Sequence, residues 1–194
     1  MELKNKLSDY IVAIENFLPN SKNQKLREIL DFNFFQFKKA EINTGVTKEN
    51  HIDNKVRITE TFSLSNTSHS MTVIHWCNYL ATALMESSKK YGEITNTNFI
   101  AEIVDIQILK YLEGGFYKTH TDSGKNMPRT LSYVYFINDD YKGGELIFEL
   151  PTNEVIKVNI QKNKLIMFPS NFLYPHKVLP VEEGVKYSVV SWAS

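Results

Sequence analysis

The second half of the chain is divided into short apolar segments by residues that favour turns. Seven segments from residue 99 onward have the length and composition of strands. Clusters such as Gly114-Gly115 and Asn138-Asp139-Asp140 separate them. This pattern constrains the fold most strongly, because many short strands at regular spacing pack as two facing sheets. The predicted strands are 99–112, 129–138, 144–149, 154–160, 164–168, 175–180 and 185–193.

The first half of the chain supplies the predicted helices. Residues 68–91 carry apolar side chains at helical spacing, and a shorter helix is predicted to end near Asp31. We assign His75 to the surface of the longer helix and Cys77 to core packing. Helices followed by strands predict a mostly β fold with some α structure, a β-sandwich or jelly roll with helices packed on one sheet. Further predicted elements are strands at 10–17, 34–42 and 56–64 and a polar loop at 43–55.

Size and charge limit the classes of partner. The 194 residues fit one domain, and 22 basic residues balance 22 acidic ones. Zero net charge argues against nucleic acid, whose binding depends on clustered lysine and arginine. The single cysteine excludes an intramolecular disulfide and favours a cytoplasmic location. We also expect no signal peptide and no membrane span, since no apolar run approaches about 20 residues.

Three side chains form a candidate metal site. His120 and Asp122 lie two residues apart at the end of an apolar segment, and such residues on a strand share a face. We expect His176 to reach them from a distant strand across the barrel. Two imidazoles and one carboxylate suit iron(II) with open coordination positions. The His-x-Asp triplet alone is weak evidence, because Asp122 can equally be a turn residue before Ser123-Gly124.

Four segments of the sequence carry a family resemblance. They are ILKYLEGGFYKTHTDS, RTLSYVYFINDDYKGGELIF, KNKLIMFPSNFLYPHKV and GVKYSVVSW. Together they resemble the iron(II)- and 2-oxoglutarate-dependent dioxygenases, and among these they are most similar to the prolyl 4-hydroxylase-like branch. The resemblance is specific over residues 104–192. It implies a double-stranded β-helix core at about 99–194, joined in a single domain to a helical and strand part at about 1–98.

The resemblance assigns a role to each residue of the candidate site. It makes His120, Asp122 and His176 the iron ligands. It makes Lys186, ten residues after His176, the partner of the distal carboxylate of 2-oxoglutarate. A buried carboxylate needs a cation, which supports that role. The alternative for Lys186 is a solvated strand residue. The implied cofactors are Fe(2+), 2-oxoglutarate and O2, with ascorbate as a further reductant.

Three more positions match the family less specifically. Tyr111 matches a tyrosine that hydrogen-bonds the co-substrate, Arg129 a basic residue near the substrate, and Trp192 an aromatic residue near the metal. Their structural alternatives are sheet packing for Tyr111, a surface site for Arg129 and core packing for Trp192.

Two further candidates follow from spacing. Ser188 stands two residues after Lys186 and is expected to share its face, so its hydroxyl can add a bond to the co-substrate. Tyr117, three residues before His120, is a candidate for the pocket entrance near the substrate.

One position departs from the family. Related enzymes often have a tyrosine that reaches the distal carboxylate from the strand after the metal triplet, and Phe136 stands there. On this register Tyr135 points to the opposite face. Either Tyr111 and Ser188 compensate, or the register is wrong by one residue, which would exchange the two faces.

The resemblance implies hydroxylation of a C–H bond, with succinate and CO2 as co-products. It favours a prolyl residue in a peptide or protein, whereas a free amino acid or another small molecule is the alternative substrate. The nucleic-acid-repairing branch fits less well, since the chain has no arginine beyond Arg129. A non-catalytic metal-binding jelly roll and a purely structural β-sandwich remain as other classes. Loops 43–55 and 123–128 are candidate lids over the pocket.

Overall fold

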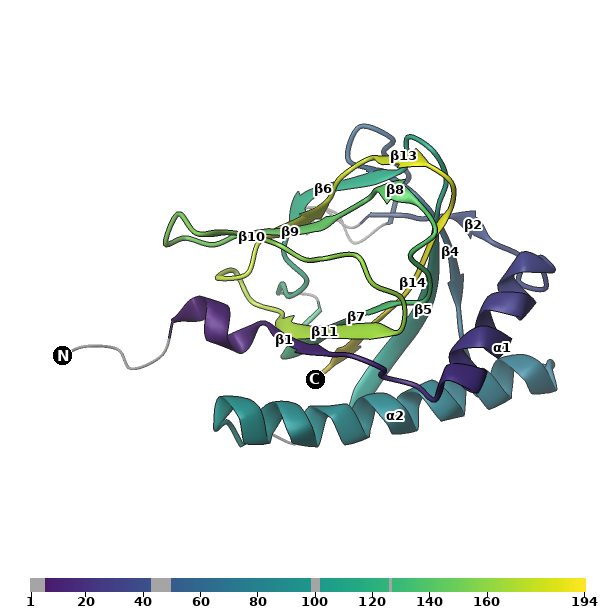
Figure 1. Cartoon of the computed structure of the whole chain (residues 1–194), viewed down its shortest axis with the longest axis horizontal. Coiled ribbons are helices and arrows are strands. Elements are labelled where there is room, and N and C mark those ends of the chain that lie inside the picture. Colours follow the sequence, from purple (N-terminus) through teal and green to yellow (C-terminus); the bar gives the residue numbers. More distant parts are fainter. Residues whose placement is uncertain (1–5, 43–49, 99–101, 126) are drawn as a thin grey trace.

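A computed structural model gives the fold of the protein: two antiparallel sheets enclose a pocket, and two helices lie outside one of them (Figure 1). The structure describes residues 6–42, 50–98, 102–125 and 127–194. Within these residues the larger sheet has the order β1 (Val12–Ile14), β11 (Lys164–Pro169), β7 (Leu131–Phe136), β14 (Lys186–Ala193), β5 (Ile103–Tyr111), β4 (Glu60–Ser63) and β2 (Lys38–Lys39).

The smaller sheet carries part of the pocket wall. Its order is β10 (Val155–Lys157), β9 (Leu146–Glu149), β12 (His176–Val178), β6 (Phe116–His120) and β3 (Arg57–Ile58). A separate pair joins β13 (Val181–Glu183) to β8 (Lys142–Gly143). The helices are η1 (Leu7–Tyr10, a 3-10 helix), α1 (Asn20–Asp31) and α2 (Met71–Thr95).

Side chains along β14 point alternately into the pocket and into the core that faces the helices. Lys186 and Ser188 line the pocket, as do Val190 and Trp192 farther along the same face. Tyr187, between the first two, belongs to the core that packs against the helices. Successive strand residues point to opposite faces, so the central strand of the sheet supplies the functional face and the structural face together.

Helix α2 covers the outer face of the large sheet. Its buried side chains, including Val73, Leu80 and Leu84, repeat at helical spacing and pack with Ile108 of β5. Asn96 ends the helix with a left-handed backbone (φ 52°). The assignments of His75 to the exposed surface and Cys77 to core packing are confirmed. Within the described residues, no helix is long and apolar enough to cross a bilayer.

Several predicted strands are shorter or divided. Residues 56–64 form two strands in different sheets, β3 and β4, with Thr59 between them. The predicted strand at 34–42 contributes only β2, and that at 10–17 only β1. Strands β6, β8 and β13 lie outside the predicted strands. In β6, exposed polar side chains hide the alternation. Residues 43–49 of the predicted polar loop lie outside the described residues.

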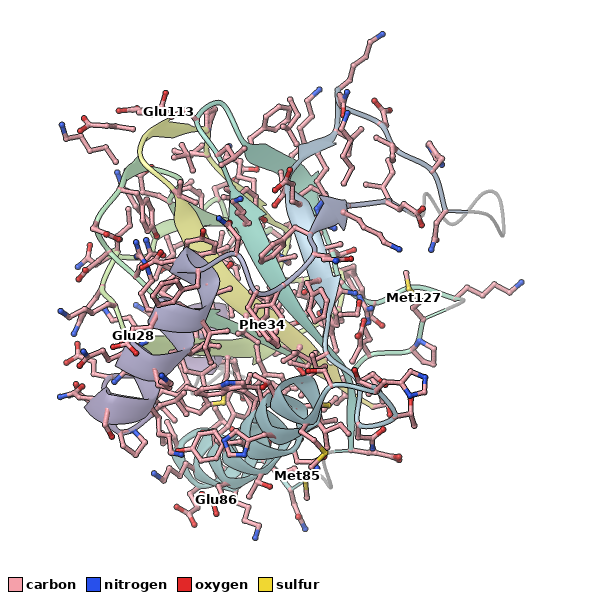
Figure 2. All side chains as sticks on the ribbon, turned by 90° about the vertical axis from the view of Figure 1, so that its right-hand side faces the viewer. Glu28, Phe34, Met85, Glu86, Glu113 and Met127 are labelled. Carbon is pink, nitrogen blue, oxygen red and sulfur yellow. The ribbon has the colours of Figure 1, made fainter. Side chains whose placement is uncertain are left out.

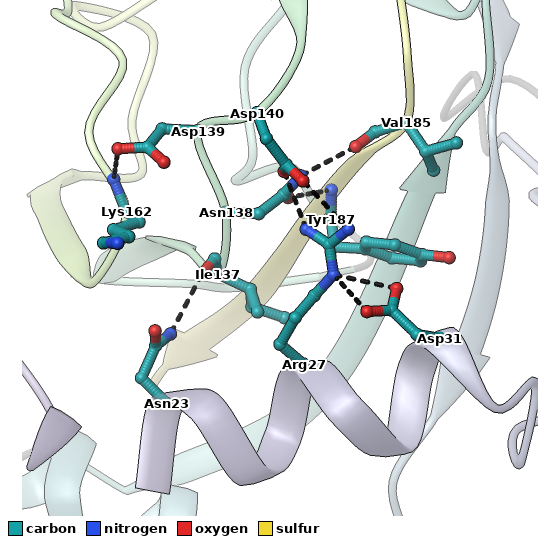
Figure 3. A network of polar contacts seen from close by, with 10 residues as sticks. All are labelled: Asn23, Arg27, Asp31, Ile137, Asn138, Asp139, Asp140, Lys162, Val185 and Tyr187. Atoms are coloured by element: carbon teal, nitrogen blue, oxygen red, sulfur yellow. Dashed lines mark hydrogen bonds and ion pairs between the residues drawn. The ribbon is translucent and has the colours of Figure 1, made fainter. Parts of the chain in front are cut away.

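A polar network holds the β7–β8 connection against strand β14 (Figure 3). The buried amide of Asn138 accepts a hydrogen bond from the Tyr187 backbone N–H at 2.7 Å and donates to the Val185 carbonyl at 2.8 Å. The same amide donates to Asp140, which in turn accepts from Arg27 of α1 at 2.7 Å. Asn138 thus bridges the backbone on both sides of position 186.

Replacing Asn138 with alanine is expected to destabilise the fold by about 1–3 kcal/mol, because the Tyr187 backbone N–H would stay buried without an acceptor. Thermal and urea unfolding of the purified variant measure this cost. Gln24→Ala, which removes an exposed side chain of α1, is the matched control. Equal stability of N138A and the unchanged protein would contradict the bridging role.

Candidate metal centre and its pocket

Three potential metal ligands meet at one end of the small sheet. The Nε2 atom of His120 lies 3.5 Å from Oδ1 of Asp122, and Nε2 of His176 lies 3.7 Å from Oδ2 of the same carboxylate. One ligand atom from each residue falls within 4.8 Å of the others. Two ligand atoms that each lie about 2.0–2.2 Å from one ion are about 3–3.5 Å apart, close to the separations seen here, so the residues fit one divalent metal ion.

The histidines reach the site differently from the sequence expectation. His176 does not cross the barrel, because β12 pairs directly with β6 and His176 is the register partner of His120. Asp122 also lies beyond the end of β6 rather than on the strand. The two imidazoles are therefore cross-strand neighbours, with ring centroids 4.3 Å apart, and the carboxylate approaches from the following bend.

Hydrogen bonds orient both imidazoles for metal binding. Nδ1 of His120 lies 2.8 Å from the Lys118 carbonyl, and Nδ1 of His176 lies 3.1 Å from the Tyr174 carbonyl. A carbonyl only accepts, so each Nδ1 donates and each Nε2 keeps its lone pair for a metal. Burial is the main cause that lowers the pKa of His176 to about 4, and the nearby His120 acts in the same direction. The His176 ring is therefore neutral at neutral pH.

The carboxylate of Asp122 is held in its ionised form. Burial by itself raises the pKa of Asp122, but His176, His120 and a hydroxyl donor together bring that pKa well below its usual range. The donor is Ser132 on β7, whose Oγ lies 2.7 Å from Oδ2, and Ser170 lies 2.8 Å behind it. The large sheet thus positions a ligand that follows a strand of the small sheet.

An irregularity in β6 brings an aromatic ring against the site. Three residues of β12 (His176–Val178) face four of β6 (Tyr117–His120), so β6 carries an extra residue. Tyr117 and His120 therefore share a face and stack with centroids 3.6 Å apart. Strand β3 pairs with β6, and Arg57 is the register partner of Tyr117. The guanidinium of Arg57 lies 4.6 Å from the Tyr117 ring centroid.

The three ligands face a cavity of about 200 Å³ between the two sheets. Met127, part of the cavity wall, lies on a loop that projects from the body of the molecule (Figure 2). Residue 126 of the candidate lid 123–128 lies outside the described residues. The cavity brings together all nine predicted site residues: His120, Asp122, His176, Lys186, Tyr111, Ser188, Arg129, Tyr117 and Trp192.

Lys186 is a buried cation at the cavity wall. Its side chain is 1% exposed, and Nζ donates to the Gly144 carbonyl at 2.6 Å. Burial lowers the pKa of Lys186 to about 7, while Glu145 acts in the opposite direction. A Cβ on Gly144 would lie 3.3 Å from Lys186 Cδ, so the glycine leaves room for the lysine chain. The predicted alternative of a solvated lysine is wrong.

The phenyl ring of Phe136 faces Lys186, with Nζ 5.2 Å from the ring centroid. Tyr135 points to the opposite face, where its hydroxyl accepts a hydrogen bond from Asn23 of α1 at 2.7 Å. The register error considered as an alternative is therefore excluded. The Tyr111 ring lies 5.3 Å from Lys186 Nζ, and burial raises the pKa of the Tyr111 hydroxyl.

Arg129 and Trp192 form one side of the cavity. The guanidinium carbon of Arg129 lies 3.5 Å from the Trp192 ring centroid, a close cation–π contact. Arg129 also donates to the backbone carbonyl of Asp122 at 3.3 Å. Sequence reasoning missed Arg57, because its strand is only two residues long and the only signal was a basic residue in the segment 56–64.

Comparison with known proteins finds similarity to one enzyme family in the C-terminal part of the chain. Residues 106–194 match the model of the 2OG-Fe(II) oxygenase superfamily. A PKHD-type hydroxylase of Rippkaea orientalis is 34% identical over 90 residues, which cover 43% of this chain and 39% of that protein. One from Synechococcus is 35% identical over 98 residues, covering 46% and 42%. The matched part of the chain thus covers about two-fifths of the length of each of these relatives.

Solved structures match over nearly the whole chain. A prolyl hydroxylase from Trichoplax adhaerens, in complex with a hypoxia inducible factor oxygen degradation domain peptide fragment, superposes with a TM-score of 0.78 at 20% identity, covering 96% of this chain and 84% of that one. A Pseudomonas putida prolyl-4-hydroxylase gives 0.73 at 18% identity, covering 95% and 91%. These structures confirm the predicted double-stranded β-helix fold. The match of residues 106–194 agrees with the predicted resemblance to the iron(II)- and 2-oxoglutarate-dependent dioxygenases.

Proposed function

We propose that this chain, whose residues 106–194 match the model of the 2OG-Fe(II) oxygenase superfamily, is an iron(II)- and 2-oxoglutarate-dependent oxygenase that hydroxylates a prolyl residue in a peptide or protein. The observation that carries the proposal is the placement of two histidines, one aspartate and a buried lysine around one cavity. Iron(II) suits the first three, and the lysine suits the far carboxylate of the co-substrate.

The donor atoms support iron binding without saturating the ion. His120, Asp122 and His176 would bind it through two neutral nitrogens and one charged oxygen. All three belong to the cavity wall, so the remaining coordination positions would open toward the cavity. When bound, iron(II) and 2-oxoglutarate supply the oxidising power for hydroxylation, with O2 consumed and succinate and CO2 released.

The chain's own contribution is binding, orientation and exclusion of water. Lys186 would donate to the distal carboxylate of 2-oxoglutarate, and Tyr111 and Ser188 lie where their hydroxyls can add hydrogen bonds. Ser188 stands two residues after Lys186 on the same face of β14, opposite Phe136 in register. These two hydroxyls are the available substitutes for the donor that a phenylalanine lacks.

The proposed substrate enters next to the aromatic and basic residues of the cavity. Tyr117, stacked on His120, and Trp192, beneath Arg129, provide apolar surfaces of the kind that a proline ring packs against. The prolyl hydroxylase from Trichoplax adhaerens is in complex with a peptide fragment and shares the fold, which supports a peptide over a free amino acid.

Succinate formation tests the proposed activity. The purified protein with iron(II), 2-oxoglutarate and ascorbate is expected to form succinate faster when proline-containing peptides are added, and mass spectrometry should show one added oxygen atom on the peptide. Absence of succinate under every condition would reject the enzyme. Succinate that forms equally without peptide, and with no peptide product, would direct the search to small-molecule substrates.

A further inference from the structure

Two arginines line the cavity without an acidic partner. The chain has three arginines, and Arg27 is occupied by Asp31 and Asp140 on the outer face (Figure 3). Arg57 and Arg129 both belong to the cavity wall. Among the residues that the structure describes, neither lies within 4.0 Å of a carboxylate. Half-buried arginines without a counter-ion are unusual, since their charge is costly away from water.

The two arginines stand on different sides of the metal site. Arg57 belongs to β3 of the small sheet and lies over Tyr117, whose other contact is the His120 ring. Arg129 precedes β7 of the large sheet, lies over Trp192 and bonds the backbone of Asp122. Each guanidinium thus rests on an aromatic ring next to a different metal ligand. These rings fix the planes of the guanidiniums. Arg57 also donates to the hydroxyls of Tyr111 and Tyr117, but a guanidinium carries five N–H groups, so further donors stay available for another molecule.

Arg57 also has an unused donor. Its Nε is buried and has no hydrogen-bond partner among the described residues. A buried donor without a partner is unfavourable, and a bound carboxylate would satisfy it. Burial lowers the pKa of Arg129, whereas Asp122 and Asp105 act in the opposite direction. Among the described residues, neither arginine has a carboxylate partner like Asp31 and Asp140, which pair with Arg27.

Among the residues that the structure describes, the charges in the cavity balance except for these arginines and Glu41. Divalent iron and the dianionic co-substrate cancel each other. The carboxylate of Asp122 and the ammonium of Lys186 cancel likewise. Beyond these, the cavity wall contains Arg57 and Arg129 against Glu41, which is exposed. The complete site would therefore keep an excess of positive charge beside the open coordination positions, and this favours an anionic substrate.

We propose, resting on the function proposed above, that the substrate is an acidic peptide whose carboxylates flank the target proline and pair with Arg57 and Arg129. A guanidinium presents its N–H groups in a fork that matches a carboxylate, and such charged hydrogen bonds are the stronger ones. The two arginines belong to different sheets, so a peptide with acidic residues on both sides of the proline can engage both.

Peptide binding tests this inference without turnover. Labelled peptides with one proline flanked by glutamate, glutamine or lysine are titrated by fluorescence anisotropy against the protein loaded with zinc and 2-oxoglutarate. We expect the glutamate peptide to bind about 10-fold tighter than the glutamine peptide, and the lysine peptide to bind weakest. Raising the salt concentration should reduce the glutamate preference, because part of it is electrostatic.

Variants assign the preference to the two arginines. Arg57→Gln and Arg129→Gln should each bring the glutamate and glutamine peptides to within about 3-fold of each other, and Arg57→Lys should retain an intermediate preference. Lys89→Gln, which removes an exposed charge from helix α2 outside the cavity wall, is the matched control and should keep the full preference. Binding of 2-oxoglutarate is measured on each variant to establish that it is folded.

The outcomes separate this inference from the proposed function. Equal binding of the three peptides by a protein that binds 2-oxoglutarate in a metal-dependent manner overturns the acidic substrate alone. A glutamate preference that survives in both Arg57→Gln and Arg129→Gln also overturns it. Competition by free L-glutamate at the concentration at which the glutamate peptide competes overturns the peptide in favour of a small acid. Failure to bind 2-oxoglutarate with any metal overturns both proposals.

Discussion

Replacing Asp122 or His176 with alanine is expected to abolish iron binding and succinate formation. Each residue supplies one of the three donor atoms that converge within 4.8 Å among the residues that the structure describes. Removal of residues that merely support a metal ligand costs about 10–100-fold in metal affinity, and loss of a ligand itself should exceed that range. Metal titration followed by a coupled succinate assay measures both effects on the same samples.

A graded series makes this prediction specific. Ser132→Ala, which removes the hydroxyl 2.7 Å from the Asp122 carboxylate, should weaken iron binding by about 10–100-fold without abolishing it. His75→Ala removes an exposed histidine on α2, outside the cavity wall, and should change neither iron affinity nor turnover. An Asp122→Ala protein with undiminished iron affinity would refute the assignment of the ligands.

The residue types of the site could be predicted from the sequence, whereas their spatial relations could not. His120, Asp122, His176 and Lys186 carry chemistry that a spacing pattern reveals, and the structure brings all four to one cavity. The pairing of β12 with β6 depends on contacts 56 positions apart in sequence, as the partners His120 and His176 show. Pattern reasoning gives the faces of a strand but not the identity of its neighbour, so the expected crossing was wrong.

Two local features were hidden for a different reason. The extra residue in β6 places Tyr117 on the same face as His120, although strict alternation would put residues three apart on opposite faces. Likewise, Thr59 divides what looked like one strand, and only this division places Arg57 in the small sheet beside the metal site. Neither irregularity has a glycine or proline to mark it in the sequence.

The fold class was accessible because it depends on many weak signals rather than on one register. Seven strand segments and two helices specify two sheets covered on one side, even with errors of several residues at the ends. At Phe136 the sequence left two registers open. The structure decided between them through Tyr135, whose hydroxyl is bonded to Asn23 on the helix side.

Lys186→Met is expected to weaken 2-oxoglutarate binding by about 10–100-fold and, at the same time, to stabilise the protein without co-substrate. The lost binding follows from removal of a charged hydrogen-bond donor to the distal carboxylate. The gain in stability follows from burial: Lys186 is 1% exposed and has no carboxylate partner among the described residues. A methionine fills similar space without a charge to desolvate.

The pH dependence distinguishes this explanation from simple damage to the pocket. The pKa of Lys186 is about 7 in the folded protein, below the ordinary 10.5, so the folded state resists protonation of this group. Between pH 10.5 and pH 7 the unfolded chain binds a proton at Lys186 and the folded protein does not, so the free energy of unfolding decreases as the pH falls. This contribution to stability is complete above about pH 10.5 and is lost as the pH falls through 7. The excess thermal stability of Lys186→Met should accordingly be small near pH 10 and largest at pH 7 and below.

Co-substrate binding should show the opposite dependence. A carboxylate binds the protonated ammonium, so in the unchanged protein the affinity for 2-oxoglutarate should fall about tenfold per pH unit once the pH exceeds 7. Calorimetric titration of the zinc-loaded protein from pH 6 to 9 measures this slope, and Lys186→Met should lack it. Lys186→Arg keeps its charge throughout the range and should also lack it. A slope that persists in both variants would place the titrating group elsewhere and remove Lys186 as the anchor.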